Sequence, residues 1–472
     1  MDRQQISIKA TQSLLSAFRR VTTISHWFSR RLTHAGALIV GTMIAAAGFG
    51  VDTRVSLAYV LFSVAFSLLM VGFIARGRIR PKLELTRWLP KFVTVGTPVR
   101  YTISIKNTSS YLLAGFTLEE RLRQQYPTAV EFISRRHSGN MTRASNRFDR
   151  IIGYPDWVEW LRDLRAVEIK TVSIPTLRSG QSTNIELELQ PRHRGIAIFE
   201  YFGITRNDPL GLWRAICDLP AEESLVVLPR IYSVRWPTFS GKRLYQRGGI
   251  SQASHVGDSE EFRSLRDYRP GDPIRAIHWR SWARTGRPVV KEYQEEYFAR
   301  HALVLDTATA ARNDEAFEAT ISIAASFAVA QPDADTLLDL LFVAVEFSQS
   351  TVGSASGSGA VKTITVGRGL GNTETLLSIL AGVKPCAPET FQQLVRTVTA
   401  HAAVISSAIL VFQYWDESRA QLVAALKAIG IGVRIYVPDN ASRPATPAFP
   451  PEGYWVAPTQ IREILAQAPI FF

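Results

Sequence analysis

Two long runs of apolar residues near the N-terminus dominate the pattern of hydrophobic and polar positions. Residues 35–51 form an uncharged run of 17 residues, and residues 55–75 form a second run of 21. A helix needs roughly 17–25 apolar residues to cross the hydrocarbon core of a bilayer. Only Asp52, Thr53 and Arg54 separate the two runs. The pattern therefore predicts a transmembrane helical hairpin at residues 35–75.

Basic residues flank this hairpin at both outer ends. Residues 1–82 contain 11 Lys or Arg and two Asp, and the connection between the apolar runs is nearly neutral. Positive residues mark the cytoplasmic side of a membrane protein. The pattern thus predicts a multi-pass protein of the inner (cytoplasmic) membrane, with cytoplasmic N- and C-termini. A cleaved signal peptide is excluded, because 34 residues precede the first run and a second run follows it.

Residues 1–34 form a basic cytoplasmic segment ahead of the hairpin. Apolar residues recur in it at helical spacing, with arginines among them: Leu14, Phe18, Val21, Ile24, Phe28 and Leu32. This arrangement is typical of an amphipathic helix that lies at a membrane interface. A basic tail that only sets the membrane topology fits the pattern equally well, and both interpretations stay open.

The period of the pattern changes to two in residues 83–235. Apolar and polar residues alternate in residues 99–107 and 185–190, which indicates strands with one buried face. Turn residues separate these stretches, so we expect a β-sandwich-like domain. Residues 120–172 do not follow the alternation and are interpreted as an insertion, with a short amphipathic helix at 156–162.

Two motifs follow the last alternating stretch. The first is Pro191-Arg192-His193-Arg194-Gly195 with Asn207-Asp208-Pro209-Leu210-Gly211-Leu212-Trp213, and the second lies in a signature segment at 236–300. Together they resemble the bacterial family catalogued as domain of unknown function 58, over residues 190–310 and more loosely beyond. The second motif carries ten matching positions: Arg266, Tyr268, Pro270, Gly271, Asp272, Arg275, Ile277, Trp279, Ala283 and Arg284. Trp282 stands where that pattern has a small residue.

The signature segment supplies the candidate binding residues Arg266, Tyr268, Asp272, Arg275, His278, Trp279 and Arg284. Its dense mixed charge favours arginine–carboxylate forks. The turn at 270–273 allows Asp272 to cap the chain or to bridge to Arg275. One interpretation is an ion-pair clamp between the β-rich and α/β domains. The others are an exposed surface that grips an acidic segment or a phosphate, and, least favoured, a hydrolytic site using His278 and Asp272.

Strands and helices alternate in residues 301–472, which predicts a mostly parallel sheet. The order resembles a von Willebrand factor A-like domain, which often binds Mg²⁺ through Asp-x-Ser-x-Ser. Here that position reads Asp306-Thr307-Ala308-Thr309-Ala310, and alanine offers no oxygen to a hard cation. We therefore expect no metal site. Asp306 and Asp416 are interpreted as capping and hydrogen-bonding residues at strand ends.

Composition and motifs argue against several classes of function. Most of the net charge of +13 lies next to the apolar runs, so nucleic-acid binding is not expected. The two cysteines are far apart and lack metal-ligand spacing. No phosphate-binding glycine motif or nucleophile elbow occurs, so we expect neither a cofactor nor catalysis.

The family resemblance implies a membrane-anchored scaffold or adaptor. Its expected partners are a MoxR-type AAA+ ATPase and other von Willebrand factor A-like proteins, in complex assembly or envelope remodelling. The alternatives are an anion- or ligand-binding protein or an enzyme that uses the signature segment, and a metal-dependent adhesion-type domain.

Overall fold

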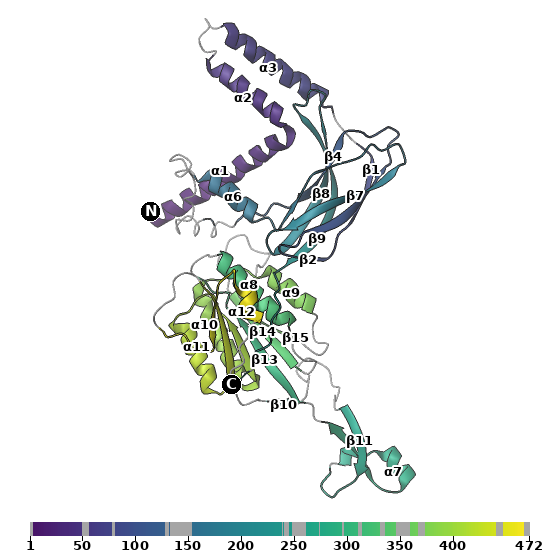
Figure 1. Cartoon of the computed structure of the whole chain (residues 1–472), viewed down its shortest axis with the longest axis vertical. Helices are drawn as coiled ribbons and strands as arrows, with labels where there is room; N and C mark the ends of the chain where they lie inside the picture. The colour runs from purple at the N-terminus through teal and green to yellow at the C-terminus, as the bar shows by residue number, and fades with distance from the viewer. Residues whose placement is uncertain are drawn as a thin grey trace. The chain divides into compact units, whose positions relative to one another are not determined.

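The computed structural model divides into two compact units, Met1–Leu228 and Pro229–Phe472 (Figure 1). It describes residues 3–49, 56–77, 81–127, 132, 153–237, 239, 245–247, 261–272, 274–294, 297–309, 314–330, 336–345, 359–366, 373–439 and 447–466. The architecture is mixed, with sheets and helices in both units. The connection between the two apolar runs lies outside the described residues, as does the glycine-rich stretch at 367–372, whose sequence is interpreted as a loop.

The first unit begins with three helices, α1 (Arg3–Arg31), α2 (His34–Phe49) and α3 (Ser56–Ala75). Helices α2 and α3 pack against each other. Within α3, Leu57–Ala75 is long and apolar enough to cross a membrane, whereas the apolar helix His34–Gly48 is shorter. Large side chains of α3 such as Leu57 and Ile74 are exposed, as expected for a helix that faces lipid.

Two sheets follow, and their inner faces share one core. The first has the order β1-β3-β7-β5, with bounds Leu83–Trp88, Val99–Asn107, Ser182–Pro191 and Val167–Ile169. The second has the order β2-β9-β8-β4-β6, with bounds Phe92–Thr94, Arg214–Leu228, Gly195–Asn207, Phe116–Leu122 and Val172–Ser173. Ile103 and Leu187 from the first sheet meet Leu118 and Phe199 from the second. The alternating stretches at 99–107 and 185–190 are strands, as predicted.

One ion pair crosses the interior between these sheets. Arg87 of β1 donates to both carboxylate oxygens of Glu120 in β4, at 3.0 and 2.6 Å. The Tyr101 hydroxyl donates to the same carboxylate at 3.2 Å. The side chains of Arg87 and Glu120 are 3% and 0% exposed. Each charge would be costly to bury alone, and each is neutralised by the other. The pair therefore ties the two sheets together.

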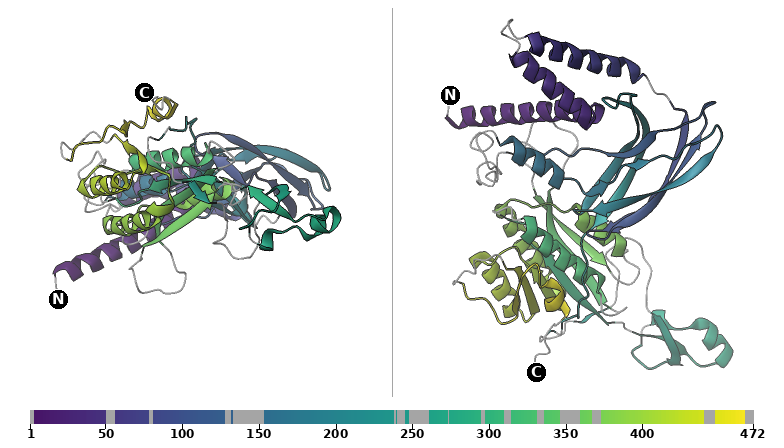
Figure 2. Two further views of the ribbon diagram at one scale, coloured as in Figure 1. Left: turned by 90° about the horizontal axis from the view of Figure 1, so that it is seen from below. Right: turned by 45° about the horizontal axis from the view of Figure 1, so that its top comes forward.

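The predicted insertion at 120–172 contains helix α6 (Tyr154–Asp163), and the strands β4, β5 and β6 occupy its two ends. Helix α6 lies beside α1 (Figures 1 and 2). The indole N–H of Trp157 donates to the hydroxyl oxygen of Thr22 at 2.9 Å, and both residues are buried. The short amphipathic helix predicted at 156–162 is thus confirmed, and it packs on the N-terminal helix.

The second unit contains a seven-stranded sheet whose main path is β15-β14-β13-β16-β17-β18, with β10 pairing β13. The bounds in that order are Gly359–Val366, Thr336–Val345, Tyr297–Leu305, Ser407–Val411, Gly432–Pro438, Gly453–Val456 and, for β10, Tyr245–Arg247. The pairings from β14 to β18 along the path are parallel, and β15 is antiparallel to β14. The expectation of a mostly parallel sheet is confirmed.

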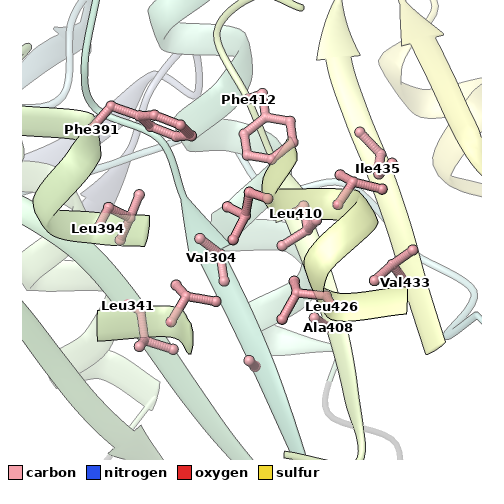
Figure 3. Close-up of a cluster of buried hydrophobic side chains, with 14 of the residues drawn as sticks. Val304, Leu341, Phe391, Leu394, Ala408, Leu410, Phe412, Leu426, Val433 and Ile435 are labelled. Atoms are coloured by element: carbon pink, nitrogen blue, oxygen red, sulfur yellow. The ribbon is translucent and has the colours of Figure 1, made fainter. Parts of the chain in front are cut away.

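Among the described residues, the α-helices that accompany this sheet are α8 (Asp314–Val329), α9 (Thr373–Gly382), α10 (Phe391–His401), α11 (Glu417–Ala428) and α12 (Ile461–Ala466). Figure 3 shows Phe391 and Leu394 of α10 and Leu426 of α11 directed toward Val304 and Leu410 of the central strands. Alternate strand residues such as Leu303 and Leu305 are also fully buried. Since successive strand residues point to opposite faces, the sheet is covered on both faces. Burial on both sides explains why its strands are continuous apolar runs.

Candidate functional site

The signature segment forms a small sheet of its own. Strands β11 (Glu261–Asp267) and β12 (Val289–Gln294) are antiparallel, and the connection contains the 3₁₀ turn η1 (Ile274–Ala276) and helix α7 (Trp279–Thr285). The amide of Tyr268 donates to the carbonyl of Pro288, and Ile277 forms an isolated bridge with Val290. Ile277, Val289 and Val290 are buried. These contacts fold the connection back onto the strands.

A tight turn at the end of β11 is held by an arginine fork. The amide of Asp272 donates to the carbonyl of Arg269 at 3.0 Å, and Gly271 between them has φ 108°. Proline followed by a residue with positive φ is the pattern of a type II turn, which explains Pro270-Gly271. Arg266 donates from both terminal nitrogens to Asp272, each at 2.7 Å. The amide of Arg269 also donates to this carboxylate, at 2.8 Å.

These hydrogen bonds strongly lower the pKa of the Asp272 carboxyl group. The Arg266 hydrogen bonds, with the Arg269 amide, lower the pKa of Asp272 to about 2. Asp272 therefore stays ionised at neutral pH and holds the turn. The side-chain partner of Asp272 is Arg266, so the alternative of a bridge to Arg275 was wrong. Arg275 lies instead in η1 with an exposed side chain.

His278 acts as the N-cap residue of α7. Its amide donates to the carbonyl of Val289 at 2.8 Å, and its Nδ1 lies 2.7 Å from the Ser281 hydroxyl. The helix ends at Gly286, whose φ of 68° suits glycine. His278 and Asp272 therefore each have their own structural partner. This arrangement orients α7 and gives no support to a hydrolytic pair.

This hairpin carries exposed aromatic, aliphatic and cationic side chains. Trp279 is 60% exposed and stacks on Trp282, with ring centroids 5.3 Å apart, and Ile274 is 69% exposed. Residues 265–291 contain seven Lys or Arg but two Asp, and Asp272 already binds Arg266. Exposed arginines of the connection between β11 and β12 include Arg275, Arg280, Arg284 and Arg287. We call Ile274, Trp279 and these four arginines the tip surface.

The seven predicted site residues thus separate into two groups. Arg266, Asp272 and His278 hold the hairpin together, and Tyr268 supports it through its backbone amide. Arg275, Trp279 and Arg284 belong to the tip surface. Sequence reasoning missed Ile274, Arg280 and Arg287. A count of charge along 265–291 could have found the two arginines, because basic residues predominate there.

A second place of interest lies at the carboxyl ends of β13 and β16. In open α/β sheets, ligands bind where neighbouring strands lead in opposite directions, and the sheet order puts that point between these two strands. Asp306 follows β13 and is fully buried. Arg419 of α11 donates to Asp306 Oδ2 from Nε at 2.8 Å and from Nη2 at 2.5 Å. The amide of Ala308 donates to the other oxygen at 2.9 Å.

Arg419 also binds the acidic residue that follows β16. Its Nη1 donates to Asp416 Oδ2 at 2.7 Å, while its amide donates to Asp416 Oδ1 at 2.9 Å. Its guanidinium lies over the rings of Tyr414 and Phe391, at 3.7 and 4.3 Å from their centroids. Burial alone would lower the pKa of Arg419, but Asp306, together with Tyr414 and Asp416, raises it above its ordinary value. A permanent cation therefore fills this crevice.

The roles expected for the two aspartates are confirmed. Asp416 is the N-cap of α11, and Asp306 is a buried hydrogen-bond acceptor. Within the described part of the chain, no group of three or more His, Cys, Asp or Glu side chains could hold a metal ion. Arg419 was missed, because a residue 113 positions from Asp306 gives no local sequence signal.

The motif at 207–213 connects the β-sheets of the first unit to its apolar helices. It is the turn between β8 and β9, closed by Asp208 accepting from the amides of Leu210 and Trp213. The indole N–H of Trp213 donates to the carbonyl of Leu69 in α3 at 2.9 Å. The amide of Thr33, between α1 and α2, donates to the carbonyl of Leu212 at 3.0 Å. We call these two contacts, Trp213 with Leu69 and Thr33 with Leu212, the helix junction.

The hairpin and the first strands of the α/β sheet match a protein family whose activity is unknown. The family described as "Protein of unknown function DUF58" matches residues 264–351, which include all seven predicted site residues. The family resemblance is thereby confirmed, over a stretch that begins later than the predicted 190–310. A Bacillus subtilis (strain 168) protein, "Uncharacterized protein YeaD", is 27% identical over 175 residues. That alignment covers 36% of this chain and 41% of the relative, so it spans less than half of either protein.

Similar solved structures cover only parts of the chain. The CARDB domain of PF1109 from Pyrococcus furiosus is 11% identical, with a TM-score of 0.14 over 30% of this chain and 94% of that domain. A PapD-like domain of human CEP192 is also 11% identical, with a TM-score of 0.16 over 31% of this chain and 86% of that domain. Scores this low carry no argument about fold or function.

Proposed function

We propose that this protein is a membrane-anchored, non-enzymatic adaptor whose tip surface binds an acidic face of a protein partner. The observation that carries the proposal is the exposure of Trp279 and Ile274 among exposed arginines. Aromatic residues and arginine dominate the energetics of protein interfaces, and large apolar side chains left in water are often binding sites. The partner class that the family resemblance implies is a MoxR-type AAA+ ATPase, together with other von Willebrand factor A-like proteins.

We include in this proposal a von Willebrand factor A-like second unit. The sheet order, with the antiparallel strand β15 beyond β14, supports it. In such a unit, the crevice at the strand ends would carry Arg419 in place of a metal ion. The unit would then act through protein contacts rather than through a bound cation.

We further include a two-helix hairpin in the inner membrane, with both termini in the cytoplasm. Packing of α2 against α3 supports it, although α2 has 16 residues and so a length of about 24 Å. A helix a few ångströms shorter than the hydrocarbon core is accommodated by local thinning of the bilayer. The basic residues at both outer ends of the hairpin support the orientation.

An anion- or ligand-binding protein, or an enzyme, built on the same segment has weaker support. Arg266 and His278, two of its expected ligand-holding residues, are already bound to Asp272 and Ser281. Of the residues expected to hold the anion, Arg275 and Arg284 remain, and both are exposed.

A cross-linked pull-down of the full-length protein from detergent-solubilised host membranes, read by mass spectrometry, tests the adaptor proposal. The test variant combines Trp279→Ser, Arg275→Glu and Arg284→Glu. The matched control combines Arg396→Glu and Arg462→Glu, which change exposed arginines on α10 and α12. We expect an AAA+ ATPase with the parent and the control, and its loss with the test variant.

Equal recovery with all three proteins would remove the tip surface as the contact. Recovery of no reproducible protein partner would reject the adaptor proposal and favour the ligand-binding alternative.

A further inference from the structure

Helix α1 has one apolar face that is buried against the insertion. Leu15 and Phe18 are 6% and 4% exposed and contact Trp157 and Trp160 of α6. Thr22, one turn further along, accepts the indole hydrogen bond of Trp157. This face therefore already has its partner within the first unit.

A second apolar face of the same helix has no such cover. Val21, Ile24 and Phe28 recur at intervals of three and four residues, which places them on one side of a helix. They are 48%, 57% and 46% exposed, and Trp27 at the edge of this face is 44% exposed. A stripe of large apolar side chains in contact with water is unfavourable, so it requires an apolar environment. We call these four residues the outer face of α1.

Helix α1 itself carries only basic charges, and one of them, Arg30, pairs with Asp218 of β9 at 3.2 Å. Arg20 is exposed, and the Arg31 guanidinium lies 4.5 Å from the centroid of the Trp27 ring. Residues 3–51 contain no Asp or Glu at all. An apolar stripe with tryptophan at its edge and arginines beside it is the composition of helices that lie in an anionic membrane interface.

The short connection between α1 and α2 places the outer face of α1 close to the apolar helix pair. Helix α1 ends at Arg31 and α2 begins at His34, so the C-terminal end of α1 lies at the start of the apolar helix pair. The chain turns sharply there, and α1 does not continue the axis of α2 (Figures 1 and 2). The helix junction fixes this corner, because Leu212 accepts from Thr33 while Trp213 donates to Leu69 of α3. Arg76, directly after α3, packs over Phe73 at 4.1 Å on the same side.

We propose that the outer face of α1 lies in the headgroup region of the cytoplasmic leaflet and binds anionic lipid there. The inference rests on the membrane anchoring proposed above. The anchor supplies the proximity, so a modest interfacial affinity is sufficient. The opposite face of α1 then carries α6, so the insertion is held at the membrane surface.

Depth measurement by spin labelling tests this placement on the full-length chain in vesicles of phosphatidylglycerol and phosphatidylethanolamine. The background carries Cys217→Ser and Cys386→Ala, and single labels are placed through Ile24→Cys, Thr23→Cys and Val64→Cys. Thr23 is exposed on a polar side of α1, and Val64 is 51% exposed on α3. We expect the label at Ile24 about 5–10 Å into the interface, the label at Thr23 in water and the label at Val64 in the hydrocarbon core.

The three labels separate the possible failures. A water-exposed label at Val64 would reject the membrane anchor itself, and the adaptor proposal with it. A lipid-embedded Val64 with Ile24 as water-exposed as Thr23 would reject the inference alone. Strong spin–spin coupling between Ile24 labels of two chains would assign the outer face to a second copy and would also overturn it.

Fluorescence quenching by brominated lipids provides a second measurement that keeps both cysteines. Trp27→Phe should reduce the quenchable fraction of the tryptophan emission. Trp88→Phe, which removes a 56% exposed tryptophan of β1, should not. Identical quenching in the two variants would also contradict the placement.

Discussion

Arg419 and Asp306 form a buried ion pair although 113 positions separate them, with Nε 2.8 Å from Oδ2. Their side chains are 1% and 0% exposed. Removal of one partner would leave the other charge buried without compensation. We expect Arg419→Ala to lower the free energy of unfolding of the second unit by about 3–5 kcal/mol.

Chemical denaturation of the full-length chain, followed by Trp415 and the other tryptophans, measures this loss. Arg462→Ala, at an exposed position of α12, is the matched control and should change stability by less than about 0.5 kcal/mol. Equal effects of the two variants would mean that the pair contributes nothing.

The same pair predicts the response to metal. Because the Arg419 guanidinium occupies the position between Asp306 and Asp416, we expect millimolar Mg²⁺ to leave the melting temperature unchanged. A functional site would stabilise the fold by about 2.7 kcal/mol at a free Mg²⁺ concentration 100 times its Kd. A shift that Asp306→Asn abolishes would restore the adhesion-type interpretation.

Arg266 and Arg275 should behave differently, although both belong to the family pattern. Arg266 holds Asp272 in the turn, so Arg266→Ala should increase hydrogen exchange across residues 264–291. Arg275 is exposed, so Arg275→Ala should leave that exchange unchanged and affect only partner binding. If Arg275→Ala also loosens the hairpin, Arg275 has a structural role that its exposure does not reveal.

Acid should loosen the same turn. Hydrogen bonds from Arg266, together with the Arg269 amide, lower the pKa of Asp272 from 3.8 to about 2. A lowered carboxyl pKa stabilises the fold fully above pH 3.8, and this contribution is lost as the pH falls through about 2. The carboxyl carbon shift of Asp272 in ¹³C-aspartate-labelled protein, assigned with Asp272→Asn, measures this. A titration midpoint near 3.8 would show that the fork is absent in solution.

Close approach at the helix junction predicts a contrast between two glycines of α2. A Cβ at Gly36 would collide with the Leu212 carbonyl oxygen, whereas a Cβ at Gly41 meets nothing within 4 Å. Gly36→Ala should therefore destabilise the first unit by about 1–3 kcal/mol, and Gly41→Ala should not. Thermal unfolding of the reconstituted protein compares them, and equal melting temperatures would argue against the junction.

Local patterns in the sequence were sufficient for much of the fold. Strict alternation identified β3 at Val99–Asn107, since one face of that strand is buried and the other is not. Apolar runs of five to six residues, as at residues 340–345 and 408–412, identified the central strands of the second unit. Each of these signals depends only on neighbours within one element, so a single sequence contains it.

The sites depend on contacts between distant residues, which the sequence does not contain. Trp282 departs from the family pattern and stacks on Trp279, a contact that the sequence does not reveal. In α1, Phe18 and Ile24 both fit one helical repeat, yet Phe18 packs on α6 and Ile24 is exposed. A repeat of 3.6 residues records which positions are apolar and not which of two partners covers them.

Strand β9 joins the helix junction to the second unit without interruption. It begins at Arg214, next to Trp213, and ends at Leu228, where the first unit ends. Its 15 residues extend over about 50 Å, and its ladder with β8 is perpendicular to its axis. A mechanical load applied at Pro229 would thus be transmitted along the strand to the helix junction, in shear across many hydrogen bonds at once.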